Sequence, residues 1–203
     1  MDFTQLIKMR RSTRAFMEKQ ITDEELNAVL AAAQAAPTGS ALYKDIHLTV
    51  LRDRDVMHVL AEASADRTED KAEMDRVFAR SRRLTPTGGT SGNGVAKRYD
   101  PFYGAPVAII VSHRVQDAQP GIEFSNAAII AYQMHLAATG LGLGSVLLWF
   151  VIETMRWKPE LKLESHLRLP EGFAPVIGVC LGHTEAKIEE REINTDRYPV
   201  DYI

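Results

Sequence analysis

The sequence predicts a domain in which helices enclose a buried β-sheet. Two short apolar runs, APVAIIVS (105–112) and APVIGVCLG (174–182), have the length and composition of buried strands, and the first is apolar on both faces. A longer run, GIEFSNAAIIAYQMHLAATGLG (121–142), is apolar almost all round and predicts a central helix. The chain of 203 residues suits a single domain, 1–203, or one protomer of an intertwined oligomer.

The N-terminal part predicts two helices that begin with the same motif. MDFTQLIKMRRS (1–12) has Asp2 as N-cap and a glutamine three residues later. ITDEELNAVLAAAQAAP (21–37) has Thr22 as N-cap and Glu25 at the matching position. Such a capping box satisfies backbone N–H groups that the first helical turn leaves without partners. The proline that ends the second segment disfavours helical geometry at the residue before it, so we expect the helix to stop there.

A strand and a charged region are predicted next. IHLTVLRD (46–53) alternates apolar and polar residues, which is typical of a strand. Residues 53–83 are strongly charged and have apolar residues at helical spacing, which predicts two surface helices. TPTGGTSGNG (85–94) predicts a flexible loop that is long enough to cover a site as a lid.

The C-terminal part continues with shorter elements. The central helix is expected to end at Gly140 as its cap. SVLLWFV (145–151) predicts an extended segment, and KPELKLESHLRLP (158–170) predicts a short amphipathic helix that its proline stops. The tail from Thr184 onward is charged and has few residues that would bury themselves.

Composition narrows the classes of function. The formal net charge is -3, so a nucleic-acid-binding protein would need a localised basic patch. The single cysteine, Cys180, lies in an apolar run, which rules out a disulfide within the chain and indicates a buried thiol in a reducing compartment. Arginines interrupt the place where the core of a secretory signal would lie, and the apolar runs are too short to span a membrane. We expect a cytoplasmic protein with no nucleic-acid and no membrane partner.

A basic cluster stands out near the N-terminus. KMRRSTRAF (8–16) places Lys8, Arg10, Arg11 and Arg14 within seven positions, around two hydroxyl residues. On a helix, Arg10 and Arg14 would share a face at i, i+4. Guanidinium groups and hydroxyls together can satisfy the oxygens of a phosphate dianion. A solvated basic face, which the macrodipole favours near a helix C-terminus, explains the pattern equally well.

Two loops of small residues are further candidates for a ligand site. PTGSALY (37–43) offers close backbone approach and short hydroxyls, although a helix stop followed by a turn is the simpler explanation of an isolated match. TGLGLGSV (139–146) superficially resembles a dinucleotide-binding loop, but it lacks the third glycine of GxGxxG and follows a helix rather than a strand. A helix cap with tight packing explains its glycines, and the backbone that follows can still line a flat ligand.

No acid–base or covalent machinery is evident from the sequence. The six histidines show no HxxxH or HxH spacing, so we predict no metal site. His135 lies in the apolar helix and is expected to be a core residue with satisfied hydrogen bonds. Ser40 and Ser145 have no identifiable base that would make either a nucleophile. This pattern fits an enzyme whose cofactor supplies the reactivity and in which no side chain is catalytic.

Five motifs follow one another in a set order along almost the whole chain: LIKMRRSTRAF, AAAQAAPTGS, YGAPVAIIV, NAAIIAYQMHLAATGLGLGS and LRLPEGFAPVIGVCLGHTEA. Together they resemble the nitroreductase family of FMN-dependent oxidoreductases, and residues 53–100, a variable helical and lid insertion, are the least similar part. The resemblance implies an α+β fold with a mixed central β-sheet flanked by helices, in an intertwined homodimer. It also implies two FMN sites at the dimer interface, each lined by both chains.

The resemblance implies roles for individual residues. Arg10 would meet the FMN phosphate, and Arg14 would reach the ribityl chain and the N1/O2 edge of the ring, where a cation stabilises reduced flavin. The loop 37–40 would come from the partner chain, and the tail would supply a second cation for the phosphate. The implied cofactor-binding residues are Arg10, Arg11, Ser12, Arg14, Pro37, Thr38, Gly39, Ser40, Gly144, Ser145, Leu147, Leu148, Lys187 and Arg191.

The loop after the second helix departs from the family's pattern. Members commonly carry asparagine and glutamine there, as in PSSGNLQPW, whereas this chain has Ala41 and Tyr43, followed by Lys44 and Asp45. The change removes amide contacts to the flavin ring or the substrate and places a phenol near the site, so Tyr43 is the expected substrate contact. FMN binding is expected to survive, because the phosphate and ribityl contacts lie elsewhere.

The activity that the resemblance implies is an NAD(P)H-dependent flavin oxidoreductase, with FMN as cofactor and NADH or NADPH as co-substrate. Its cycle would be ping-pong: hydride passes to the flavin N5, the oxidised nicotinamide leaves, and a nitroaromatic or quinone acceptor takes the electrons. The open alternatives are a flavin-binding protein with little turnover, and reductive dehalogenation or oxygen-dependent flavin cleavage on the same fold. The acidic net charge disfavours nucleic-acid binding through RRSTR.

Overall fold

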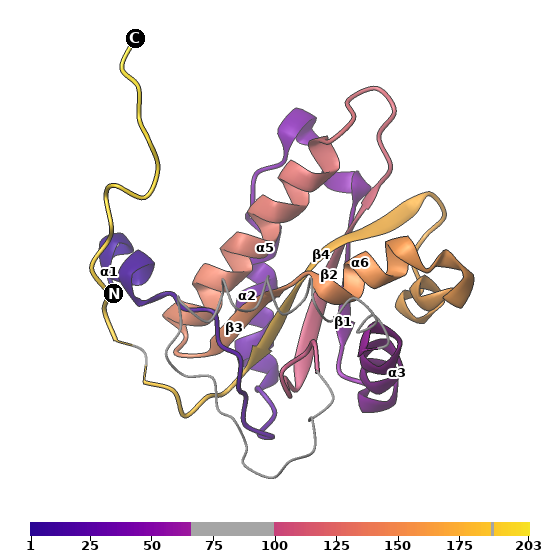
Figure 1. Cartoon of the computed structure of the whole chain (residues 1–203), viewed down its shortest axis with the longest axis horizontal. Coiled ribbons are helices and arrows are strands. Elements are labelled where there is room, and N and C mark those ends of the chain that lie inside the picture. Colours follow the sequence, from indigo (N-terminus) through magenta and orange to yellow (C-terminus); the bar gives the residue numbers. More distant parts are fainter. Residues whose placement is uncertain (66–99, 188) are drawn as a thin grey trace.

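The core of the molecule is one sheet of four antiparallel strands (Figure 1). A computed structural model describes residues 1–65, 100–187 and 189–203 of the chain. Across the sheet the strands run in the order β1–β2–β4–β3, with bounds Ile46–Leu51 (β1), Val107–Arg114 (β2), Gly144–Leu148 (β3) and Phe173–Gly182 (β4). Both outer strands, β1 and β3, had been predicted as extended segments, and both inner strands as buried ones.

The inner strand β2 faces two separate cores. Val107, Ile109 and Val111 point to one side of the sheet and pack in one hydrophobic cluster. Ala108 and Ile110 point to the other side and pack in a second cluster. Side chains alternate along a strand, so a run that is apolar at every position can fill both cores. The prediction that this run is apolar on both faces is confirmed.

Helices cover both faces of the sheet. Helices α2 (Asp23–Gln34) and α5 (Ile122–Gly140) contribute to the first cluster. Helices α3 (Arg54–Ala65) and α6 (Phe150–Trp157) contribute to the second. Helix α1 (Phe3–Met9) contacts α5. The fold is therefore α+β with helices on both sides of a central sheet, as expected. Its named strands are all antiparallel, and the parallel element in the described ranges is an isolated bridge between Ser12 and Ser145.

Both predicted capping boxes are present. The Asp2 side chain accepts from the Gln5 N–H at 2.9 Å. The Thr22 hydroxyl accepts from the Glu25 N–H at 3.1 Å, and the Glu25 carboxylate accepts from the Thr22 N–H at 2.7 Å. Local sequence therefore fixes where α1 and α2 begin.

Two element boundaries differ from the sequence-based expectation. Helix α5 is capped by Leu141 instead of Gly140, and Gly142 takes the left-handed turn at φ +76°. The extended segment 145–151 ends at Leu148, because α6 begins two residues later. The first difference moves a boundary by one residue and the second by three, and both elements stay in place.

The predicted helix 158–170 is wrong. This stretch forms two 3₁₀ turns, Pro159–Leu161 and Leu163–Leu167. Lys162 (φ 50°) and Arg168 (φ 51°) have left-handed backbones, which an α-helix of L-residues cannot continue through. Leu163 and Leu167 are nevertheless buried, so the amphipathic pattern identified the buried side chains correctly.

Some expectations fall outside the described residues. Of the two surface helices expected in 53–83, α3 is the first, and the remainder of that region and the loop 85–94 are not described.

Cys180 is fully buried, and burial, aided by Asp100, raises the pKa of its thiol, which therefore stays protonated. Among the helices of the described ranges, none is both long and apolar enough to span a bilayer.

Candidate functional site

The stretch that follows α1, residues 10–16, is extended instead of helical, and we call it the basic segment. Helix α1 ends at Met9, and the Arg10 backbone (φ −55°, ψ 124°) leaves helical geometry. Thr13 is buried, whereas Arg11, Ser12, Arg14 and Ala15 are exposed, so Thr13 alone among these five side chains points into the protein. The expectation that Arg10 and Arg14 share a helix face is therefore wrong.

Strand β3 holds this segment in place. The Thr13 N–H donates to the Ser145 carbonyl at 2.9 Å, within the parallel bridge of Ser12 and Ser145. The Thr13 side chain lies directly on Gly144, where a Cβ atom would come within 2.8 Å of Thr13 Cγ2. No side chain fits at position 144 unless Thr13 moves. Glycine at this position thus permits the close approach of the two segments.

A buried polar chain joins the segment to α5 and β3. Arg10 Nη1 lies 3.0 Å from His135 Nε2, and His135 Nδ1 lies 2.5 Å from Ser145 Oγ. The His135 side chain is buried, and burial, together with the charge of Arg10, lowers the pKa of His135 to about 4. At neutral pH the imidazole is therefore uncharged. The prediction that His135 is a core residue with satisfied hydrogen bonds is confirmed, and its partner is a residue of the basic segment.

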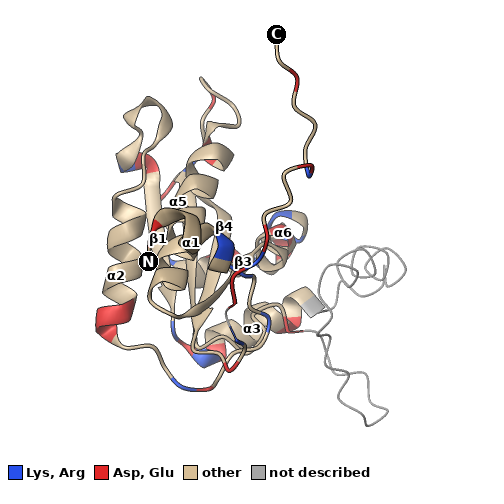
Figure 2. Ribbon diagram, turned by 90° about the vertical axis from the view of Figure 1, so that its left-hand side faces the viewer, with Lys and Arg blue, Asp and Glu red and all other residues tan. Residues whose placement is uncertain are grey.

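The segment and the start of the C-terminal tail lie side by side (Figure 2). Arg11 Nη2 donates to the Glu189 carbonyl at 3.2 Å, and the Arg191 N–H donates to the Lys8 carbonyl at 3.3 Å. Lys8 and Glu190 form an ion pair of 3.9 Å. Residues 189–191 thereby bring a further arginine to the basic segment.

Four guanidinium groups gather at this junction, which we call the arginine cluster: Arg10, Arg11, Arg191 and Arg197. Burial and the positive charges of the other three lower the pKa of Arg191. Within the described parts of the chain, no carboxylate lies within 4 Å of any of the four. These positive charges repel one another, so an anion bound among them would lower the electrostatic energy of the folded chain.

Strand β3 presents its residues to two different sides. Ser145 reaches His135 on the α5 side of the sheet, and Leu147, two positions later, is 38% exposed. Leu148 points the other way and is buried in the cluster formed by α3 and α6. Strand alternation turns the Leu148 side chain into the core, and the expectation that Leu147 and Leu148 lie next to a flavin stays a prediction.

The loop 37–40 lies at the opposite end of α5 from the arginine cluster. The Gly39 N–H donates to Asn126 Oδ1 at 2.7 Å, and the Ser40 hydroxyl donates to Gln119 Oε1 at 2.8 Å. Asn126 precedes His135 by nine positions, which corresponds to about 13 Å along a helix. Within one chain, the structure therefore does not bring Pro37, Thr38, Gly39 and Ser40 together with the arginines.

Asn126 is itself anchored to the sheet. Its Nδ2 lies 3.2 Å from His113 Nε2, and His113 Nδ1 lies 2.6 Å from the Arg114 carbonyl. An imidazole that donates through Nδ1 has an acceptor at Nε2, so Asn126 donates to His113 and accepts from Gly39. This buried chain fixes the loop relative to β2.

Tyr43 borders a small polar pocket of about 230 Å³ between the end of α2 and β1. Its side chain is 59% exposed. Thr38 and His47 line the same pocket, and the buried Thr38 hydroxyl has no hydrogen-bond partner among the described residues. This pocket lies near the part of α5 that contacts the loop 37–40. Tyr43 therefore lies beside that loop and not beside the arginine cluster.

Sequence reasoning missed two members of the site. The sequence predicts His135 as a core residue and gives it no role toward a ligand. Its contact with Arg10 spans 125 residues, so no spacing of residues in the sequence indicates it. Arg197 lies in a tail without any motif. Lys187, which had been expected beside Arg191, is exposed. In the described part of the chain, no group of three or more His, Cys, Asp or Glu side chains could hold a metal ion.

Solved structures with the same fold carry FMN or are described as NAD(P)H enzymes. A nitroreductase with bound FMN from Desulfitobacterium hafniense superposes with a TM-score of 0.77 at 24% identity, covering 100% of this chain and 99% of its own. A second, with bound FMN, from Bacteroides fragilis has a TM-score of 0.72 at 28% identity and full coverage of both chains. A Bacteroides thetaiotaomicron protein, provisionally assigned as NADH dehydrogenase/NAD(P)H nitroreductase, has a TM-score of 0.65 at 18% identity, with coverage of 98% and 96%.

Sequence comparison gives the family directly. No curated protein matches this sequence significantly. The model of the nitroreductase family matches residues 7–183, a span that contains the basic segment, the loop 37–40, α5 and all four strands. The chain therefore belongs to the nitroreductase family.

Proposed function

We propose that the protein is an FMN-dependent oxidoreductase that uses NADH or NADPH and reduces nitroaromatic or quinone-type acceptors. The observation that carries the proposal is the arginine cluster, a concentration of positive charge without a carboxylate of its own among the described residues. The FMN phosphate is a dianion, which such a cluster of guanidinium groups can bind through charge-assisted hydrogen bonds. The bound FMN of the family members from D. hafniense and B. fragilis supports this choice of anion.

In this proposal the chain's residues act chiefly by binding. Arg10 and Arg191 would hold the phosphate through charge-assisted hydrogen bonds, and exposed Ser12 and Arg14 would contact the phosphate and the ribityl chain. Exposed Leu147 would provide an apolar edge for the isoalloxazine ring. The flavin would supply hydride and electron transfer between the nicotinamide and the acceptor. No side chain of the chain is required as an acid or base.

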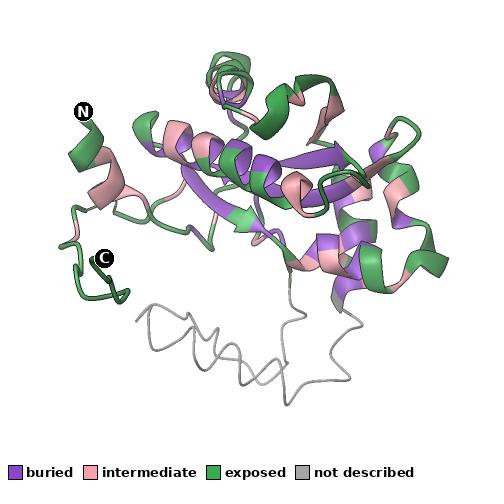
Figure 3. Ribbon diagram, turned by 90° about the horizontal axis from the view of Figure 1, so that it is seen from above, coloured by how far each residue is buried: buried purple, intermediate pink, exposed green. Residues whose placement is uncertain are grey.

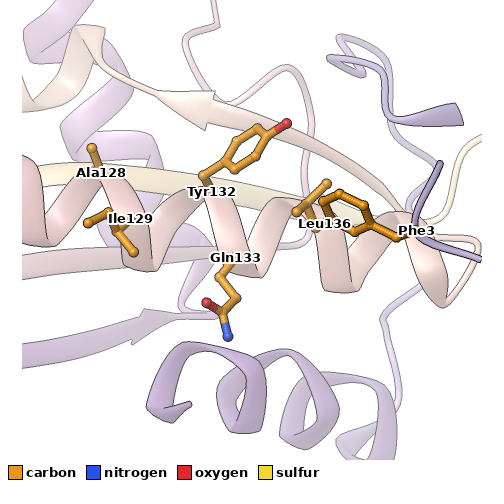
Figure 4. Close-up of a pocket in the computed structure, with 6 residues that line it drawn as sticks. All are labelled: Phe3, Ala128, Ile129, Tyr132, Gln133 and Leu136. Atoms are coloured by element: carbon orange, nitrogen blue, oxygen red, sulfur yellow. The ribbon is translucent and has the colours of Figure 1, made fainter. Parts of the chain in front are cut away.

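A homodimer would complete the site. The outer face of α5 exposes Ile129 (42%) and Tyr132 (43%) and forms an apolar groove of about 510 Å³ with Phe3 and Leu136 (Figure 4). Figure 3 shows α5 striped, with buried residues toward the sheet and exposed ones outward. Apolar surface of this kind on a central helix is typical of an obligate interface.

The separation of the two halves of the site along α5 also supports the dimer. The arginine cluster and the loop 37–40 lie at separate points along the helix, so one chain does not bring both to the same part of a ligand. Two chains that pack through α5 could place the cluster of one beside the loop of the other. We therefore propose that each FMN contacts Pro37, Thr38, Gly39 and Ser40 of the partner chain.

The first test is spectroscopic. The purified protein should show flavin absorbance, and anaerobic NADH or NADPH should bleach it. Menadione or nitrofurazone should then restore the oxidised spectrum. Protein that binds FMN but is not reduced by either nucleotide would be a flavin-binding protein with little turnover, and protein without any affinity for FMN would refute the proposal.

Arg10→Glu should abolish FMN retention. The loss of one charge-assisted hydrogen bond costs about 1.5–3 kcal/mol, and the new carboxylate adds repulsion of the phosphate. The matched control is Lys19→Glu, which makes the same charge change at an exposed residue beyond the basic segment. The ratio of FMN to protein after gel filtration is the measurement. A full complement of flavin in Arg10→Glu would contradict the placement of the phosphate.

Tyr43→Gln should change acceptor preference and leave FMN affinity nearly intact. The substitution restores the amide that the family commonly has in this loop, and a single added or lost hydrogen bond to an acceptor changes kcat/KM by about fivefold. Relative kcat/KM values over a panel of nitro compounds and quinones measure the effect. Unchanged ratios would place Tyr43 outside the substrate pocket.

Deletion of residues 190–203 should lower dimer stability and flavin content together, because it removes two arginines of the cluster and the exposed apolar residues at the end of the tail. Those residues are Tyr198, Val200, Tyr202 and Ile203. Deletion of 198–203 alone keeps Arg191 and Arg197 and should mainly weaken the dimer. Light scattering and flavin content at several protein concentrations distinguish the two. A monomer with bound FMN would contradict the shared site.

A further inference from the structure

The hydrogen-bond chain through His135 joins the anion site to the core of the protein. We propose that His135 is a positioning residue, which holds the Arg10 guanidinium in place for the FMN phosphate by accepting its hydrogen bond with a neutral imidazole. The proposal rests on the proposed function for the identity of the anion. Its geometry rests on the contacts of Arg10, His135 and Ser145.

The contacts define one tautomer. A guanidinium group has only N–H donors, so His135 Nε2 must accept from Arg10 Nη1. The imidazole proton is then on Nδ1, which donates to Ser145 Oγ. The Ser145 hydroxyl has its own hydrogen free to point at the His135 carbonyl, 3.5 Å away. Both ring nitrogens of His135 and the Ser145 hydroxyl then have hydrogen-bond partners.

The surroundings keep the imidazole uncharged. His135 is 1% exposed, and the groups that face it are Arg10 from the basic segment, Ser145 from β3 and the Tyr132 ring, whose centroid lies 6.3 Å away. Arg191 adds a further positive charge that interacts with Arg10. A proton on Nε2 would place two donors and two positive charges against each other, so protonation would break the contact with Arg10.

A neutral acceptor has a specific advantage at this position. A carboxylate would orient Arg10 equally well, but it would neutralise the charge that the phosphate needs. The imidazole orients the guanidinium through one N–H and leaves the full positive charge, with the remaining N–H groups, for the anion. Burial of His135 also makes the acceptor rigid, so Arg10 loses less side-chain freedom when the phosphate binds.

Two amide substitutions separate positioning of Arg10 from packing against β3. In His135→Gln the side-chain oxygen can occupy the place of Nε2 and accept from Arg10. In His135→Asn the shorter amide can occupy the place of Nδ1 and donate to Ser145, but it does not reach Arg10. We expect His135→Gln to retain FMN affinity within about threefold and His135→Asn to lose about tenfold or more.

The affinity is measured by dilution of the flavin-loaded protein, with the fluorescence of released FMN as readout. Riboflavin, which lacks the phosphate, is the matched ligand, and its affinity should be the same in both variants. The proposal is wrong if His135→Asn retains FMN and His135→Gln loses it. Equal losses for riboflavin and FMN would also overturn it, because His135 would then support packing only.

The tautomer is testable without any flavin. Nitrogen-15 NMR of the purified full-length chain at pH 7 should show His135 neutral, with its proton on Nδ1. An Nε2–H tautomer, or an imidazolium at pH 7, would overturn the proposal even if FMN binds as expected. A protein with the expected tautomer and no FMN affinity would instead refute the proposed function.

The pH dependence of stability gives an independent measurement. The unfolded chain protonates this histidine near 6.5, whereas the folded chain does so at about 4. Between these values the unfolded state binds more protons, so lowering the pH raises the unfolding equilibrium constant by up to about tenfold per pH unit. His135→Gln lacks this slope, so the wild type should lose more stability than the variant between pH 6.5 and pH 4. Parallel curves would contradict the neutral, buried imidazole.

Discussion

The contact between Thr13 and Gly144 is the constraint on which the site depends. A methyl group at position 144 would overlap Thr13, so the basic segment can lie flat on β3 only over a glycine. Once it lies there, Thr13 bonds to the Ser145 carbonyl, and Arg10 comes within reach of His135. The tail then adds Arg191 beside the same segment. A local packing requirement thus gathers charges from two distant parts of the sequence beside a neutral histidine from a third.

Helix α5 fills the core and also connects both parts of the site to it. Its inner face fills the core against the sheet, and its polar residues Asn126 and His135 are almost fully buried at separate points along its length. Asn126 connects the loop 37–40 to His113, and His135 connects the basic segment to Ser145. Each buried polar residue serves a different half of the site, which explains why a helix that is apolar almost all round carries them.

Local signals predicted the elements well and the site only in part. Capping boxes and buried apolar runs are local, so α1, α2 and the inner strands were predictable. The prediction that Arg10 and Arg14 share a helical face was wrong, because the Thr13 N–H donates to the Ser145 carbonyl of β3, about 130 residues later. This bond holds the segment in an extended conformation. The burial of the Leu148 side chain was not predicted, because the position of a residue along a strand decides which face of the sheet it points to. The partners of His135 could not be read from the sequence, since they are brought together only by the fold.

The loop that carries Ser40 and Ala41 has a mechanical consequence. Both residues have left-handed backbones, at φ 56° and 55°, without being glycine. Such conformations cost on the order of 1 kcal/mol or more each, and they persist where surrounding bonds over-determine them. The bonds of Gly39 to Asn126 and of Ser40 to Gln119 supply that restraint. The loop is therefore a strained segment that its hydrogen bonds hold in one conformation, and it is not a hinge. A molecule that docks against it meets one preformed shape, whereas any variant that cuts either bond would let the tension relax and change that shape.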